Sequence, residues 1–205
     1  MQLLPERAVY WEQCKTLIIA DTHFGKATHF RKAGIPVSDE VFLDNLKELD
    51  LLINRYSVAR VLVVGDFFHS DYNSEWSRFS TWLEESNLTE WLLVPGNHDV
   101  FTRKHEAGTK FRVTSAEYIE AGILFRHEPG VPADVPVICG HIHPGIRIYG
   151  QGRQSLMLPC FVQSAQLLIL PAFGKFTGLG PLKSEKGFRY FALTGQSVIE
   201  TNYAI

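Results

Sequence analysis

The chain has 205 residues, of which 45% are hydrophobic and 20% are charged, and its formal net charge at pH 7 is −2. These values are typical of a globular protein with a substantial core, and we expect residues 1–205 to form a single domain. The slightly acidic balance gives no support to nucleic-acid binding through an overall basic surface.

No secretion signal and no membrane-spanning run is apparent in the sequence, so we expect a cytoplasmic protein with no membrane partner. The three cysteines, Cys14, Cys139 and Cys160, are widely spaced and odd in number. That pattern suits a reducing compartment and predicts neither a disulfide framework nor a thiolate metal site. We expect these thiols to act as small buried hydrophobic groups.

The first predicted element is a strand at residues 16–20, which is a short apolar run rich in strand-forming residues. A helix follows it, because Ser38 can cap a helix start and apolar residues then recur at helical spacing. These apolar residues are Phe42, Leu46, Leu49 and Ile53. A second strand, at residues 61–64, is continuously apolar, and this predicts burial on both of its faces.

A second helix is predicted from about residue 74 to residue 85, with Trp76, Phe79 and Leu83 on one face. We interpret these side chains as core contacts, and the alternative is a platform on which nucleic-acid bases stack. A third apolar strand follows at residues 91–94.

From about Phe111 onward, short runs separated by turn residues predict hairpins, together with one more apolar strand at residues 135–138. The hairpin runs lie at 118–119, 123–125, 146–149, 156–158 and 167–170, and a last hairpin joins 188–191 to 197–200. An α/β half followed by a β-rich half predicts two sheets packed face to face with helices outside.

Most side chains that favour metal ions lie in short islands, each of which follows an apolar stretch. The islands are residues 21–23, 65–66, 96–99, 127 and 140–143. Their aspartates, asparagine and histidines offer oxygen and nitrogen but no thiolate, which suits divalent cations such as Mn²⁺, Fe²⁺ or Zn²⁺. Two adjacent cations can clamp the attacking and leaving oxygens of a phosphate ester. The islands therefore predict a phosphoesterase.

Each island alone also has an ordinary structural explanation. Gly-Asp and Gly-Asn pairs commonly form turns, and a lone histidine such as His127 is usually structural. In an extended segment, side chains two residues apart leave the same side, so Asp21 and His23 could reach one ion, as could His141 and His143. The occurrence of the islands together at strand ends favours the metal site over these explanations.

The ordered pattern from Asp21 to His143 resembles the calcineurin-like metallophosphoesterase superfamily. Further matching segments extend the likeness over nearly the whole sequence, at residues 19–26, 33–36, 65–70, 127–129 and 170–178. With these segments the chain is most similar to the bacterial ligase-associated metallophosphoesterases. That family consists of DNA damage response endonucleases encoded beside an ATP-dependent DNA ligase.

The resemblance implies an α/β (α+β) fold, a four-layer αββα sandwich of two mixed sheets with two metals at one edge. The implied ligands are Asp21, His23 and His143 for the first cation, and Asn97, His127 and His141 for the second. Asp66 would bridge both, since its two oxygens can span ions about 3.5–4 Å apart. A bridging water, with its pKa lowered toward about 7, would attack phosphorus in line with the leaving oxygen.

His98 matches the superfamily histidine that contacts the substrate and protonates the leaving group. Many relatives orient that histidine with an aspartate that follows the Gly-Asp pair, and this chain has His69 at that position. His98 then needs another orienting partner, such as Asp99, or acts more as a phosphate ligand than as an acid. His69 could itself face the substrate or simply pack on the surface.

The resemblance implies a dimetal-dependent phosphodiesterase that cleaves DNA in repair. Mn²⁺ is the favoured metal, and a DNA ligase, a helicase or an exonuclease are the implied partners. One alternative keeps the dimetal site but takes small nucleotides or phosphomonoesters as substrates. A protein serine/threonine phosphatase is disfavoured, because residues 65–70 and 96–99 depart from the motifs of that group. A non-catalytic scaffold is a remote alternative, because every metal position and His98 are filled.

Overall fold

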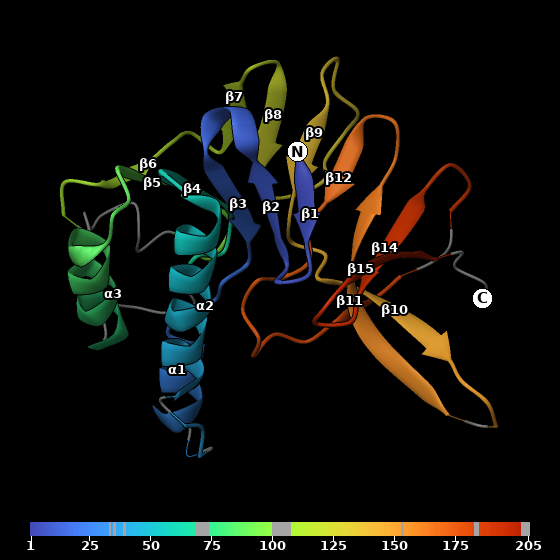
Figure 1. The fold of residues 1–205 in the computed structure, drawn as a ribbon, viewed down its shortest axis with the longest axis horizontal. Coiled ribbons are helices and arrows are strands. Elements are labelled where there is room, and N and C mark those ends of the chain that lie inside the picture. The colour runs from blue at the N-terminus through green and yellow to red at the C-terminus, as the bar shows by residue number, and fades with distance from the viewer. Residues whose placement is uncertain are drawn as a thin grey trace.

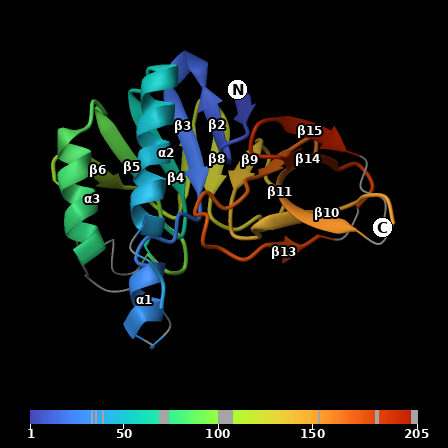
Figure 2. The same cartoon turned by 60° about the horizontal axis from the view of Figure 1, so that its bottom comes forward.

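Two β-sheets stack face to face in the part of the chain that the computed structural model describes, and helices flank one of them (Figure 1). The structure describes residues 1–32, 34, 36–38, 40–68, 74–99, 108–152, 154–182 and 185–201. In Figure 2 the helices α1, α2 and α3 all lie on one side of the two sheets.

The first sheet combines a parallel centre with an antiparallel edge. Its strands are β1 Gln2–Leu4, β2 Ala8–Trp11, β3 Thr16–Ala20, β4 Arg60–Val64, β5 Glu90–Val94 and β6 Phe111–Val113, paired in that order. The strands from β3 to β6 run parallel, whereas β1 and β2 are antiparallel to their neighbours. Every residue of β3 is buried, as is typical of a parallel strand covered on both faces.

The second sheet is also mixed and is built mainly from hairpins. Its strands are β7 Glu117–Glu120, β8 Ile123–Arg126, β9 Val137–Cys139, β10 Pro144–Tyr149, β11 Ser155–Gln163, β12 Leu167–Ile169, β13 Gly180–Pro181, β14 Arg189–Leu193 and β15 Val198–Thr201. The pairing order is β13-β10-β11-β12-β9-β8-β7, and β14 pairs with both β11 and β15. β8 and β9 run parallel, so they end at the same edge of the sheet.

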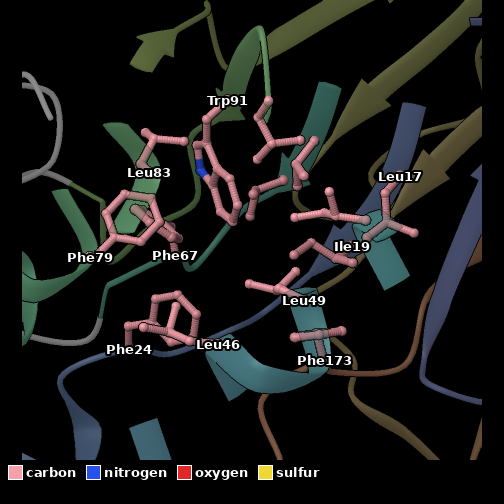
Figure 3. Close-up of a cluster of buried hydrophobic side chains, with 14 of the residues drawn as sticks. Leu17, Ile19, Phe24, Leu46, Leu49, Phe67, Phe79, Leu83, Trp91 and Phe173 are labelled. Atoms are coloured by element: carbon pink, nitrogen blue, oxygen red, sulfur yellow. The ribbon is translucent and has the colours of Figure 1, made fainter. Parts of the chain in front are cut away.

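The helices are α1 Lys26–Lys32, α2 Glu40–Tyr56 and α3 Ser74–Glu85, and a short 3-10 helix, η1 Glu12–Cys14, precedes β3. The backbone N–H of Glu40 donates to Ser38 Oγ at 3.1 Å, which places a hydroxyl cap at the start of α2. Figure 3 shows side chains of α2 and α3 packed together with those of β3 and β5 in one hydrophobic cluster. Burial of these helix faces holds the helices on the first sheet.

A second hydrophobic cluster fills the space between the two sheets. It joins Ile18, Leu62 and Leu92 of the first sheet to Phe125 and Phe161 of the second. Because alternate residues of one strand enter different clusters, each central strand of the first sheet serves both cores. The strands β3, β4 and β5 are therefore held by packing on both faces of the first sheet.

The outer face of the second sheet is covered by loops. Residues of the segments around Val135 and Phe188 pack against a third cluster, which contains Leu124, Cys160 and Val162. The expected α/β sandwich of two mixed sheets is confirmed, but the helices of the described residues all lie on the first sheet (Figure 1). The loop from β8 to β9, residues 127–136, is rich in proline and glycine, which disfavours a helix there.

The strands expected at residues 16–20, 61–64 and 91–94 and the two expected helices are confirmed. Trp76, Phe79 and Leu83 are buried, as expected for core residues. The hairpins of the second half are also confirmed. One expectation is wrong: Phe111 does not begin a hairpin but lies in β6, which pairs in parallel with β5. β1, β2, β13 and α1 were not expected from the sequence.

The cysteines of the second sheet are buried hydrophobic groups. Cys139 and Cys160 are fully buried, and burial raises the pKa of each thiol to about 12. Cys14 is partly buried and packs at the margin of the intersheet cluster. Among the described residues, no helix has the length and apolar character needed to span a membrane.

Candidate metal centre

The polar islands converge at one edge of the sandwich, at the ends of strands from both sheets. Asp21, Asp66 and Asn97 follow β3, β4 and β5, which are parallel neighbours in the first sheet. His127 follows β8, and His141 follows β9, in the second sheet. Parallel strands deliver the residues after their carboxyl ends to one edge, so residues distant in sequence meet there.

One group of possible ligand atoms joins Asp21, His23 and His143, and these atoms all lie within 4.8 Å of one another. His143 Nε2 is 3.4 Å from Asp21 Oδ1, and the Nε2 atoms of His23 and His143 are 3.2 Å apart. Asp21 is fully buried and His23 nearly so, whereas His143 is partly exposed. The group therefore faces solvent on the side of His143.

A second group joins Asp21, Asp66 and His127 within the same 4.8 Å limit. His127 Nε2 lies 3.4 Å from Asp66 Oδ1, and His141 Nδ1 lies 3.0 Å from His127 Nε2. The other carboxylate oxygen of Asp66 is 3.9 Å from His23 Nε2. Asp66 thus reaches a histidine of each group, and Asp21 is a member of both.

The backbone of these islands is unusual, because several non-glycine residues have positive φ. The values are 51° for Asp21, 47° for His23, 47° for Asp66, 70° for His141 and 48° for His143. Left-handed conformations of this kind cost energy in L-residues and concentrate at functional sites. The assumption that extended backbone brings residues two apart onto the same side is therefore wrong here. Tight left-handed turns after the strands bring these side chains together instead.

Three glycines leave room for the side chains of the site. A Cβ built on Gly65 would lie 2.0 Å from His127 Nδ1, and one on Gly140 would lie 2.4 Å from Asp21 Oδ2. A Cβ on Gly96 would lie 2.5 Å from Asp66 Oδ1. Since real Cβ atoms do not approach this closely, any other residue would displace the carboxylates and the imidazole.

The charges of the site are strongly coupled. Burial alone would raise the pKa of Asp66, but the hydrogen bond and charge of His127, with the charge of His23, lower it well below its usual range. Burial would likewise lower the pKa of His127, but the hydrogen bond and charge of Asp66 outweigh this effect and raise it. The carboxylate of Asp66 and the imidazole of His127 thus each favour the charged form of the other.

The donor set fits divalent cations. Asp21 Oδ1 is buried and has no hydrogen-bond partner among the described residues, which is costly for a carboxylate oxygen unless a cation neutralises it. Imidazole nitrogens face each other at 3.2 Å and 3.0 Å in the two histidine pairs. Carboxylate oxygen and imidazole nitrogen are the ligands that Mn²⁺, Fe²⁺ and Zn²⁺ accept.

Asn97 and His98 lie at the exposed mouth of the site, on the turn after β5. The Asn97 side-chain amide donates to Glu128 Oε1 at 2.6 Å. The backbone N–H of His98 donates to Asp66 Oδ1 at 3.2 Å, and its ring centroid is 6.4 Å from that of His23. His98 is therefore tied to the site through its backbone, with its ring beside the first group.

Asp99 holds two loops together. One carboxylate oxygen accepts from Gly96 N–H at 2.8 Å, and the other accepts from the N–H groups of Phe67 and Phe68 at 3.0 and 3.3 Å. Asp99 is fully buried, and burial raises the pKa of its carboxyl. These bonds hold Asp99 between the loops after β4 and β5. His69, which was expected either to face the substrate or to pack on the surface, lies outside the described residues.

Two residues of this region were not among the candidates from the sequence. Glu128 appeared only as part of a matching segment, and nothing in the sequence links it to Asn97. Glu75, on α3, is buried and accepts from Gly25 N–H at 2.7 Å and Thr28 Oγ1 at 2.5 Å. It thereby anchors the segment that follows His23, and a buried charge within an amphipathic helix was the available signal.

A sandwich of two mixed sheets with carboxylates and imidazoles buried at one edge is the architecture of a metal-dependent phosphoesterase. The sequence matches the calcineurin-like phosphoesterase family over residues 14–149, and the chain belongs to this family. It is accordingly a hydrolase of phosphate esters, and its family uses a centre of two metal ions.

Among solved structures, a nuclease from Pseudomonas putida, named MPE, is similar at 29% sequence identity with a TM-score of 0.81. The likeness covers 97% of this chain and 93% of the nuclease. A protein of unknown function from Aquifex aeolicus is similar at 18% identity with a TM-score of 0.42, covering 67% of this chain and 82% of that protein. No curated protein matches the sequence.

Proposed function

We propose that this protein is a nuclease that hydrolyses phosphodiester bonds in DNA with two divalent cations. The observation that carries the proposal is the shared edge at which Asp66 lies within reach of histidines from both ligand groups. Similarity to a nuclease over nearly the full length of both chains supports nucleic acid as the substrate.

The proposed ligands of the first cation are Asp21, His23 and His143, and those of the second are Asn97, His127 and His141. Asp66 would bind both. Two such cations, with Mn²⁺ favoured over Fe²⁺ or Zn²⁺, would activate water and stabilise the charge that develops on the phosphate. The chain itself would supply a rigid frame, because the ligands rest on strand ends that are packed on both faces.

His98 is proposed to donate a proton to the leaving oxygen of the substrate. It is exposed at the mouth of the site, where a phosphate can reach it, and its backbone is anchored on Asp66. An imidazole has an unperturbed pKa of about 6.5, which suits proton donation near neutral pH.

The resemblance of the sequence to the bacterial ligase-associated metallophosphoesterases also supports a role in DNA repair. We propose that the protein acts in the cytoplasm with a DNA ligase, and with a helicase or an exonuclease. Co-purification of tagged protein with these enzymes after DNA damage, compared with the same protein carrying Asp66→Asn, tests the association. Recovery of none of them would remove the proposed partners and leave the chemistry untouched.

One assay tests the chemistry and the substrate together. Metal-free protein is titrated with Mn²⁺, Zn²⁺, Fe²⁺ and Mg²⁺ against three substrates: bis-p-nitrophenyl phosphate, p-nitrophenyl phosphate and labelled DNA. We expect cleavage of the diester dye and of DNA, with the highest rate in Mn²⁺. Cleavage of only the small esters would instead favour a nucleotide or monoester phosphatase. Full metal occupancy without hydrolysis of any of them would favour a scaffold.

A further inference from the structure

A side-chain contact between Asn97 and Glu128 crosses the mouth of the site beside His127. Asn97 belongs to the turn after the first sheet's β5, and Glu128 follows His127 at the end of β8 in the second sheet. Asn97 Nδ2 lies 2.6 Å from Glu128 Oε1, which is the distance of a short charge-assisted hydrogen bond. The contact therefore joins the two sheets beside the proposed second cation.

The chemistry of the Asn97 amide and the Glu128 carboxylate fixes the orientation of the amide. An ionised carboxylate can only accept hydrogen bonds, so the amide must turn its nitrogen toward Glu128. The amide oxygen then points away from Glu128. In the flipped orientation Asn97 would present N–H donors in place of the oxygen, and a donor cannot bind a cation.

Glu128 is itself held in place by the chain around it. Arg126, a residue that is 9% exposed, donates through its guanidinium to the carbonyl oxygens of Pro129 and Val131 and so closes the loop around Glu128. On the other side, the carbonyl oxygen of His127 accepts from Gly140 N–H at 3.0 Å. The carboxylate therefore extends from a segment whose backbone is fixed on both sides.

The location of the pair distinguishes it from an ordinary surface contact. Asn97 and Glu128 are both exposed, and an exposed pair of this kind adds little to the stability of a fold. An outer partner that orients a metal ligand, by contrast, commonly changes metal affinity by about 10–100-fold when it is removed. A small effect on folding combined with a large effect on metal binding is therefore diagnostic.

We propose that Glu128 is a positioning residue that selects the amide orientation in which Asn97 Oδ1 binds the second cation. The inference rests on the proposed function, because it requires a cation beside Asn97. It predicts that binding of the second cation depends on a hydrogen-bond acceptor at position 128 and not only on the negative charge there.

The test compares Glu128→Ala with Glu128→Gln, since glutamine loses the charge but keeps an acceptor oxygen. Mn²⁺ binding to metal-free protein is measured by calorimetry and by metal analysis after gel filtration. We expect the binding step of the second cation to lose about 10–100-fold in Glu128→Ala, and to stay within about threefold of the wild type in Glu128→Gln. Glu12→Lys, which changes an exposed charge on η1, serves as the control and should leave both binding steps unchanged.

A second readout needs no metal. In ¹⁵N-labelled metal-free protein, the Asn97 side-chain amide, assigned by its loss in Asn97→Ala, should show one proton shifted by the bond to Glu128. That shift should disappear in Glu128→Ala and persist in part in Glu128→Gln. In the Asn97→Ala background, Glu128→Ala should weaken Mn²⁺ binding no further.

The outcomes separate this inference from the proposed function. If the wild type bound no metal or cleaved no phosphodiester, the proposed function would fail whatever Glu128 does. If the wild type bound two cations and cleaved DNA while Glu128→Ala bound both normally, only the role of Glu128 would be refuted. Equal loss of binding in Glu128→Ala and Glu128→Gln would show a charge effect and would also refute it.

Discussion

Asp66 contacts residues of both halves of the candidate site. Its carboxylate oxygens lie 3.9 Å from His23 Nε2 and 3.4 Å from His127 Nε2, and it also accepts from the N–H of His98. Asp21 also belongs to both ligand groups, since its Oδ1 lies 3.4 Å from His143 Nε2 and 3.7 Å from His127 Nδ1. The tight left-handed turn at Asp66, with φ of 47°, is what aims it between them.

We therefore expect Asp66→Asn to remove metal and activity together. The variant keeps the size and shape of the side chain but withdraws a charge that both cations would share. Metal content measured after gel filtration and the rate of diester hydrolysis should fall in parallel, while the circular dichroism spectrum stays that of the wild type. A variant that kept two equivalents of Mn²⁺ would refute the bridging role.

His98→Ala should have the opposite signature, with metal retained and turnover reduced. The bond that ties His98 to Asp66 uses its backbone N–H, which alanine preserves. Loss of a general acid commonly costs about 10²–10⁴-fold in rate. The loss should be larger for DNA than for bis-p-nitrophenyl phosphate, because nitrophenolate leaves easily without protonation. Loss of metal in this variant would contradict the assignment of His98 to chemistry.

At the residue scale, the sequence identified which side chains meet but not how they meet. The candidates were visible because Asp21, Asp66 and Asn97 each follow an apolar run. The turns that bring these side chains together were not visible in the sequence. A glycine marks a position where positive φ is easily adopted, whereas aspartate and histidine give no comparable indication. Glu128 escaped notice for another reason: an exposed glutamate carries no periodic pattern, and its partner lies 31 positions away.

At the scale of elements, prediction succeeded where burial is continuous. β3, β4 and β5 were recognisable because both of their faces are covered. α2 and α3 were recognisable because each has one apolar face. β6 was assigned to the wrong half of the fold, because its parallel pairing with β5 is a non-local contact. α1 has little apolar periodicity and is held through its contact with Glu75.

The strand-end loops pack so closely that a methyl group should disrupt the site. A Cβ on Gly140 would lie 2.4 Å from Asp21 Oδ2 and 2.7 Å from Ala20 Cβ, so Gly140→Ala must push Asp21 out of place. We expect a loss of about 1–3 kcal/mol in the free energy of unfolding, together with weaker Mn²⁺ binding. Chemical denaturation and calorimetry measure the two effects.

Gly150→Ala is the matched control for this variant. The nearest atom to a Cβ on Gly150 is 3.8 Å away, which is ordinary van der Waals contact, and the residue lies in the hairpin between β10 and β11. It should retain both stability and metal binding. If Gly140→Ala behaved in the same way, the loop after β9 would be more pliable than its packing indicates.

At the scale of the whole molecule, the proposed cations would link the two sheets. Asp21 belongs to the first sheet, and His127 and His143 belong to the second, so each ligand group includes residues from both. The intersheet cluster already joins the sheets through apolar contact. Metal binding would add a second connection at the edge, where buried carboxylates and imidazoles otherwise face each other.

Removal of metal should therefore lower the stability of the whole fold. A ligand present at 100 times its Kd stabilises the native state by about 2.7 kcal/mol. For a chain of this size that free energy corresponds to a rise in Tm of roughly 5–10 °C. Differential scanning calorimetry of wild-type protein with EDTA and then with excess Mn²⁺ should show this rise. Asp66→Asn should show little of it, because its proposed cation site has lost the shared carboxylate. An equal rise in both proteins would mean that Mn²⁺ stabilises the fold from somewhere other than this edge.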